Sequence, residues 1–223
     1  MNAKDSLKDI VYNAILEDIL SMEYRPGQIL NEKTMIEKYQ YSKSPIREAL
    51  QALCGDGVLR NIPRYGYEII KLSKDDVYEM IQYRRILETG MLKEKFNSLG
   101  AVHLERLRAI DEQCKNDEYD IWTHWEYNTQ FHLKLMSFCG NEYVVGELER
   151  CMNRLKRAYA QFYWDKGDHK MLQADTRYHA RILESLENKD MDLTLFYLAE
   201  DLNDFGGADN FLHYHSSLHP SSI

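Results

Sequence analysis

Four side chains in the second half of the sequence have the types and spacing of a metal site. Asn128 and His132 are four residues apart, so an amide oxygen and an imidazole would share one face of a helix. His179 and Asp201 each stand at helical spacing from apolar residues, which directs both toward an interior. Burying a carboxylate and two imidazoles costs free energy unless they are paired or bind a metal. Asn128, His132, His179 and Asp201 are therefore candidate ligands for a divalent ion.

The alternative for this set is an ordinary core, since a histidine on an apolar helix face is more often hydrogen-bonded there than bound to metal. If the ion is present, the set contributes one negative charge and leaves open positions for water or a ligand. Arg84 falls on the inward stripe of its own segment and would bind the other end of an organic carboxylate. The second interpretation of Arg84 is an ion pair with Glu88 one turn on, and both can hold together.

A second set of polar side chains opens a short segment in the first third of the chain. Ser42, Lys43, Ser44 and Arg47 face outward if the apolar residues of that segment face inward. Arg47 is the candidate base reader, because its guanidinium can give two parallel hydrogen bonds to guanine O6 and N7. The other three suit the DNA backbone. The alternative is a solvated helix face on a module that binds protein. The inward residues of the segment are Ile46, Ala49, Leu50 and Leu53.

The elements that position this second set are three helices and a hairpin. Apolar periodicity predicts a first helix that stops at Arg25-Pro26-Gly27. Asn31 is expected to cap a second helix that runs through Tyr39. A third helix covers 42–53, and extended runs at 58–62 and 67–72 flank a turn whose tip is Arg64-Tyr65-Gly66. This is the outline of a winged helix-turn-helix.

Beyond Ser73 the sequence shows only helical periodicity, which predicts an antiparallel all-helical bundle. After a first helix from Ser73, further helices are expected at about 101–116, 119–138, 142–165, 170–187 and 190–205. The fold class is mainly α, with domains at 1–72 and 73–205 and a polar tail at 206–223. Tail histidines His213, His215 and His219 are better read as solvated than as metal ligands.

Charge separates the two predicted domains. The 223 residues carry a net charge of −8 and are 44% hydrophobic, which excludes a disordered or fibrous chain. Residues 1–72 hold ten basic and ten acidic residues, so the remainder carries the whole −8. There is no apolar run of membrane-spanning length and no signal peptide, so we expect a soluble cytoplasmic protein. Four cysteines without a CxxC pair fit reduced thiols.

The first domain resembles the GntR family of bacterial transcription regulators. This resemblance implies that Arg47 and the residues before it enter the major groove, that Lys33 lies near the DNA backbone, and that Arg64-Tyr65-Gly66 forms the wing tip. Because the domain is electrically neutral, affinity per copy should be modest, and a homodimer on a palindromic operator is expected. The matching motifs are Pro26-Gly27, Leu30-Asn31-Glu32, Ser42-Lys43-Ser44-Pro45-Ile46-Arg47-Glu48-Ala49-Leu50, Leu53, Gly57 and Arg64-Tyr65-Gly66.

The second domain resembles the FCD ligand-binding domain of the FadR-type subfamily. The resemblance implies zinc, nickel or a similar ion on an Asp or Asn, a histidine four residues later, and two further histidines. Asn128, His132 and His179 match that set, whereas the third histidine falls on Asp201, which shifts preference toward harder metals. The matching motifs are Tyr83-Arg84-Arg85-Ile86-Leu87-Glu88, Phe131-His132 with Gly140-Asn141, and His179-Ala180-Arg181-Ile182-Leu183-Glu184.

Together these features predict a dimeric DNA-binding regulator, more often a repressor in this family, that responds to a small organic acid. A metal-dependent hydrolase would use the same ligand set, with an activated water as nucleophile. Against an enzyme, spacing places no further Glu or His as a general base, and there is no nucleophile-elbow motif. A protein-binding adaptor is the other alternative.

Overall fold

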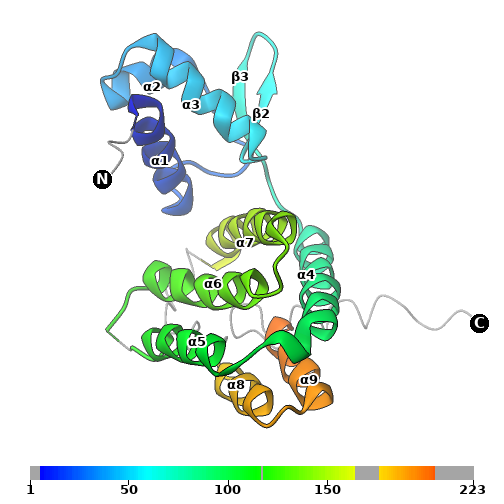
Figure 1. Ribbon diagram of the computed structural model, residues 1–223. Helices are drawn as coiled ribbons and strands as arrows, with labels where there is room; N and C mark the ends of the chain where they lie inside the picture. The colour runs from blue at the N-terminus through cyan, green and yellow to red at the C-terminus, as the bar shows by residue number, and fades with distance from the viewer. Residues whose placement is uncertain (1–5, 117, 164–175, 204–223) are drawn as a thin grey trace, which may run out of the picture. The chain divides into compact units, whose positions relative to one another are not determined.

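Residues 6–116, 118–163 and 176–203 are described by the computed structural model of the chain (Figure 1). Contacts divide the chain into two units. The first is Met1–Ser73 together with Lys156–Lys166, and the second is Lys74–Leu155 together with Gly167–Ile223. Among the described residues, no helix has the length and apolar character needed to cross a membrane.

The first unit contains the three predicted helices and the predicted hairpin. The strands form one antiparallel sheet in the order β1-β3-β2, of which Figure 1 labels β2 and β3. The two-residue strand β1 was not expected; it pairs Ile29 with Glu68 and Leu30 with Tyr67. It extends the hairpin to three strands. The elements are α1 (Leu7–Leu20), β1 (Ile29–Leu30), α2 (Glu32–Tyr39), α3 (Lys43–Gly55), β2 (Leu59–Ile62) and β3 (Gly66–Ile69).

Capping side chains set where these helices begin. Ser6 and Asp9 form a capping box at the start of α1. The Asn31 side chain accepts a hydrogen bond of 2.9 Å from the Thr34 backbone N–H, which confirms the predicted cap of α2. Pro45 falls in the first turn of α3, where its missing N–H costs little.

The inward face of α3 is confirmed, because Ile46, Ala49, Leu50 and Leu53 are all fully buried. Two apolar residues of α1 face solvent, since Leu7 and Ile10 are 55% and 40% exposed. The helix instead buries Val11, Ile15 and Ile19, a narrow stripe at four-residue spacing that packs on α3. The result is a small apolar core under α3, which leaves the opposite face of that helix open.

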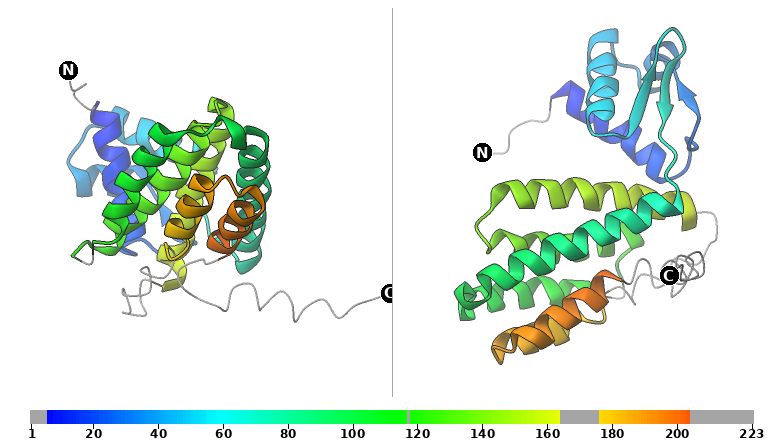
Figure 2. Two further views of the ribbon diagram at one scale, coloured as in Figure 1. Left: turned by 60° about the horizontal axis from the view of Figure 1, so that its bottom comes forward. Right: turned by 90° about the vertical axis from the view of Figure 1, so that its right-hand side faces the viewer.

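The second unit is all-helical. α8 packs against α9 and α5, and α4 packs against α9 and α6, as both views in Figure 2 allow the reader to follow. Its elements are α4 (Lys74–Lys95), the 3-10 helix η1 (Phe96–Ser98), α5 (Ala101–Cys114), α6 (Ile121–Ser137), α7 (Glu142–Tyr163), α8 (His179–Glu187) and α9 (Met191–Leu202). The residues of α7 from Lys156 onward count with the first unit.

Two predicted helices are shorter than expected. The helix predicted from 170 begins at His179, because residues 176–178 form a turn, and 170–175 lie outside the described residues. The last helix ends at Leu202 rather than 205. The tail at 206–223, with its three histidines, also lies outside the described residues.

The interior of the second unit mixes a large apolar cluster with titratable groups. Leu92, Phe131, Leu135, Ile182 and Leu198, from α4, α6, α8 and α9, are fully buried in the cluster. Among them lie buried side chains that can carry charge, which an apolar core tolerates only when they are paired. They include Glu88, Asp111, His132, His179 and Asp201.

Candidate metal centre and nucleic-acid interface

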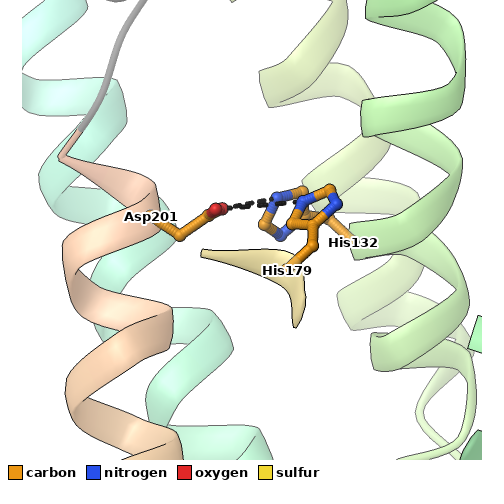
Figure 3. A group of neighbouring side chains, drawn as sticks. All are labelled: His132, His179 and Asp201. Atoms are coloured by element: carbon orange, nitrogen blue, oxygen red, sulfur yellow. Dashed lines mark ion pairs between the residues drawn. The ribbon is translucent and has the colours of Figure 1, made fainter. Parts of the chain in front are cut away.

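Three of the four predicted metal ligands meet inside the helical unit. His132 comes from α6, His179 is the first residue of α8, and Asp201 lies near the end of α9. One donor atom from each lies within 4.8 Å of the others. Asp201 Oδ2 is 3.1 Å from His132 Nε2 and 3.9 Å from His179 Nε2, and Figure 3 shows the carboxylate facing both rings. Side chains from three helices therefore converge on one point.

Several polar atoms at this point make no hydrogen bond within the described part of the chain. They are His179 Nδ1, His179 Nε2 and Asp201 Oδ1, all buried. Leaving a buried polar atom unsatisfied costs about 1–3 kcal/mol, so three at one point indicate that a further group belongs there. Two imidazoles and a carboxylate are the donors that zinc and its neighbours accept, and the residues present fit such an ion.

Each imidazole also faces a second carboxylate that the sequence did not single out for this role. His132 Nδ1 is 2.8 Å from Glu88 Oε2, and His179 Nδ1 is 3.4 Å from Asp111 Oδ1. Glu88 belongs to α4 and Asp111 to α5. Five helices of the second unit thus supply the cluster.

The charges around His132 reinforce one another. Burial alone would raise the pKa of Glu88, but the charges of Arg84 and His132 outweigh it and hold that pKa below its ordinary value. Burial would likewise lower the pKa of His132, and Glu88 and Asp201 reverse the effect, so that pKa is raised. The pKa of Asp111 is lowered in spite of burial, because the His179 ring and the Lys115 ammonium lie beside its carboxylate.

Asn128 lies one turn before His132 on α6, with Oδ1 shielded from solvent. Its role as a ligand stays a prediction. Arg84 makes the predicted ion pair, with Nε 2.8 Å from Glu88 Oε1. Its Nη2 is buried and has no hydrogen-bond partner among the described residues, which leaves one edge of the guanidinium for an anion.

In the first unit, the start of α3 presents the predicted polar set to solvent. Ser42, Lys43, Ser44 and Arg47 are all exposed. The Ser44 hydroxyl donates to Glu48 Oε1 at 2.7 Å, so it is engaged within the helix. The side chains of Lys43 and Arg47 stay exposed to solvent.

Glu32, in the first turn of α2, lies beside these two cations. Its carboxylate is 3.6 Å from Arg47 Nε and 4.0 Å from Lys43 Nζ, and the Tyr67 hydroxyl donates to it at 3.4 Å. In the sequence, Glu32 stands out only as part of the motif Leu30-Asn31-Glu32, which assigns it no role. The contact restrains the Arg47 side chain on the exposed face of α3.

The turn between β2 and β3 carries the predicted wing tip. Arg64 is exposed with a φ of 72°, and Tyr65 is 73% exposed. Gly66 has a φ of 133°, and a Cβ there would lie 2.3 Å from the backbone oxygen of Leu30, so its place depends on close packing with β1. Lys33 is exposed at the start of α2 and lies 3.8 Å from Glu37.

A winged helix followed in the chain by an all-helical unit is the domain order of a class of DNA-binding transcriptional regulators. Comparison with family models agrees: residues 7–69 match bacterial regulatory proteins of the gntR family, and residues 79–195 match the FCD domain. The chain belongs to the GntR family of transcriptional regulators with an FCD domain, which confirms the resemblance in both halves.

Curated relatives agree with this family, and a solved structure shares the fold. The chain is 28% identical over 187 residues to YdhC, an uncharacterized HTH-type transcriptional regulator of Bacillus subtilis, covering 81% of each chain. It is 22% identical to the HTH-type transcriptional repressor GlaR of Escherichia coli, covering 85% of this chain and 84% of that one. The structure of E. coli McbR/YncC aligns with a TM-score of 0.73 at 19% sequence identity. The alignment covers 97% of this chain and 100% of that one. These relatives are regulators rather than enzymes.

Proposed function

We propose that the protein is a homodimeric repressor whose affinity for a palindromic operator changes when a small organic carboxylate binds beside a metal ion in the helical unit. Membership of the GntR family carries the DNA-binding half of the proposal. The repressor sign is suggested by relatives such as GlaR and the gluconate operon repressor of Bacillus licheniformis. A cytoplasmic location follows from the DNA partner.

On the DNA side, Arg47 would read a base in the major groove, while Lys33, Ser42, Lys43 and Ser44 contact phosphates. The exposed start of α3 supports these roles. The wing tip, with Arg64, Tyr65 and Gly66, would lie against the flanking DNA backbone. A dimer would place two α3 helices about one helical turn apart, so that each reads half of a palindrome.

On the effector side, His132, His179 and Asp201, with Asn128 as a fourth donor, would hold the ion. Zinc or nickel follows from the family resemblance. When bound, the ion supplies an open coordination position for an oxygen of the ligand. Arg84 would take the ligand's carboxylate through its free Nη2 edge. The observation that carries this half is the coincidence of unsatisfied buried atoms on His179, Asp201 and Arg84.

Regulation then requires only that the ligand bind two arrangements of the dimer with different affinity. The test is a mobility shift of the fragment upstream of the protein's own gene, with a panel of organic acids added. We expect a shifted band that one acid abolishes or strengthens at least tenfold. A shifted band that no acid changes, with metal bound, would contradict the effector half.

Metal binding has its own test. Replacing both His132 and His179 by Ala should reduce the metal from about one ion per subunit to background, measured by elemental analysis of the purified protein. A matched control replaces His103, a half-buried histidine of α5, by Ala and should leave the metal in place. Full metal content in the double variant would overturn the site.

A further inference from the structure

The two imidazoles of the metal centre face carboxylates in the same order, although His132 hydrogen-bonds to Glu88 at 2.8 Å and the nitrogens of His179 lie 3.4 and 3.9 Å from their carboxylates. In both rings Nε2 faces Asp201, and in both rings Nδ1 faces a carboxylate from a different helix. Glu88 serves His132 from α4, and Asp111 serves His179 from α5. The cluster is therefore a pair of similar arrangements that share one aspartate.

The similarity extends one residue further. Glu88 uses its other oxygen to bind Arg84, four residues earlier on α4, and Asp111 uses its other oxygen to bind Lys115, four residues later on α5. The distances are 2.8 Å and 3.0 Å. Each carboxylate is thus fixed by a cation on its own helix and by an imidazole on another, and each added negative charge is balanced locally.

The shared aspartate marks which ring nitrogen would bind an ion. An ion beside Asp201 would meet Nε2 of both rings. Each ring would then carry its one N–H on Nδ1, which faces Glu88 in His132 and Asp111 in His179. Carboxylates placed in this way fix ring orientation and raise the basicity of a ligating histidine.

We propose that Glu88 and Asp111 are positioning residues of the metal centre, which hold His132 and His179 as Nδ1–H tautomers with Nε2 directed at the ion. The inference rests on the proposed metal site and adds two residues to it. Neither carboxylate is assigned to the ion itself.

The two positioning residues differ in what lies behind them. Arg84 is nearly buried, with an unpartnered Nη2, whereas the Lys115 side chain is 51% exposed. Glu88 therefore connects the metal centre, through Arg84, to the proposed carboxylate site. Asp111 connects it to Lys115 at the surface. Substitution at Glu88 should weaken both metal and carboxylate binding, while substitution at Asp111 should weaken metal binding alone.

The variants that test this are Glu88→Gln and Asp111→Asn, which keep size and remove charge. Glu112→Gln is the matched control, since Glu112 also contacts Lys115 at 2.7 Å but touches no histidine. Zn²⁺ affinity is measured on the full chain by competition with a chromogenic chelator, and folding by thermal unfolding. We expect both variants to bind Zn²⁺ about 10–100-fold more weakly, and the control to match the wild type. Carboxylate binding at saturating Zn²⁺, measured with the acid found in the operator assay, should fall only in Glu88→Gln.

A tautomer measurement keeps the inference testable if a variant unfolds. Long-range ¹H–¹⁵N spectra of the Zn²⁺-loaded wild type should show His132 and His179 as Nδ1–H tautomers, bound to the ion through Nε2. A purely structural role for the carboxylates would not predict this. Nε2–H tautomers in the wild type, or variants that bind Zn²⁺ as tightly as the control, would overturn the positioning role. Absence of Zn²⁺ binding by the wild type would instead overturn the metal site beneath it.

Discussion

At the scale of single residues, the two candidate sites share one device: a carboxylate beside the side chain that acts. Glu32 lies beside Arg47 on the DNA-binding face, and Glu88 lies beside both Arg84 and His132 in the interior. The exposed pair is weak because water screens it, with the Arg47 side chain 57% exposed. The buried pair is held more firmly. The Arg47 side chain is therefore loosely oriented, whereas Arg84 and His132 beside Glu88 are tightly oriented.

The first prediction concerns Arg47. Arg47→Ala should reduce the preference for operator over random duplex by about 1–3 kcal/mol per half-site, because a bidentate contact to guanine is lost. Fluorescence anisotropy with both duplexes measures this, and Lys8→Ala on α1 is the control. Unchanged discrimination in Arg47→Ala would refute base reading.

The second prediction concerns Glu32. Glu32→Gln should raise affinity for any duplex a few-fold, because one negative charge beside the phosphates is removed. Preference for the operator should fall, because Arg47 is less restrained. The same anisotropy titration separates the two effects. Higher affinity with full preference would show that Glu32 only repels DNA and does not orient the arginine.

The third prediction concerns two buried thiols. Burial raises the pKa of Cys139 and of Cys151 to about 11, so at pH 8 only about one in a thousand is a thiolate. Reactivity should rise with pH toward that value. Mass spectrometry after brief iodoacetamide treatment should find both unlabelled in the native protein and labelled in urea. Equal labelling in the two conditions would contradict their burial.

At the scale of elements, the sequence predicted the features that depend on residues near one another in the chain. The cap at Asn31, the inward face of α3 and the hairpin were all predicted correctly, because each depends on residues close together in the chain. Strand β1 was missed, because two residues carry no periodicity and their pairing with β3 spans nearly forty positions. The start of α8 was placed too early, since apolar spacing alone does not mark a turn.

The residues of the candidate metal centre likewise fall into those that the sequence could predict and those that it could not. His132, His179 and Asp201 could be predicted from helical spacing and family resemblance, because a ligand set leaves a pattern in the sequence. Glu88 appeared only as a partner for Arg84, and Asp111 not at all, since a contact between positions 44 apart leaves no local signal. A carboxylate four residues from a cation on an otherwise apolar stripe was the available clue.

The fourth prediction tests the packing of the wing. Gly66→Ala should destabilise the first unit by at least about 1–3 kcal/mol, because its φ is unfavourable and the new Cβ would meet Leu30 O. Gly55→Ala, which meets nothing within 4 Å, is the control and should be neutral or slightly stabilising. Urea unfolding measures both. Equal stability of the two variants would contradict the close approach of β3 and β1.

At the scale of the whole molecule, charge and function are divided between two parts of the chain. The first 72 residues are neutral and the rest carries −8, so long-range attraction to DNA is small. Binding must then depend on a few exposed cations, whose number the proposed dimer would double. Each dimer would offer up to eight from Lys33, Lys43, Arg47 and Arg64, and the logarithm of affinity should fall with the logarithm of salt with a slope no steeper than about −7.

The most direct measurement is selection of bound fragments from the source genome, with and without a chelator that strips the metal. The account predicts enrichment of fragments sharing a short palindrome, lost in Arg47→Ala, with recovery that changes when metal or a carboxylate ligand is removed. Recovery of genomic DNA no better than random duplex, at every salt concentration tried, would contradict it.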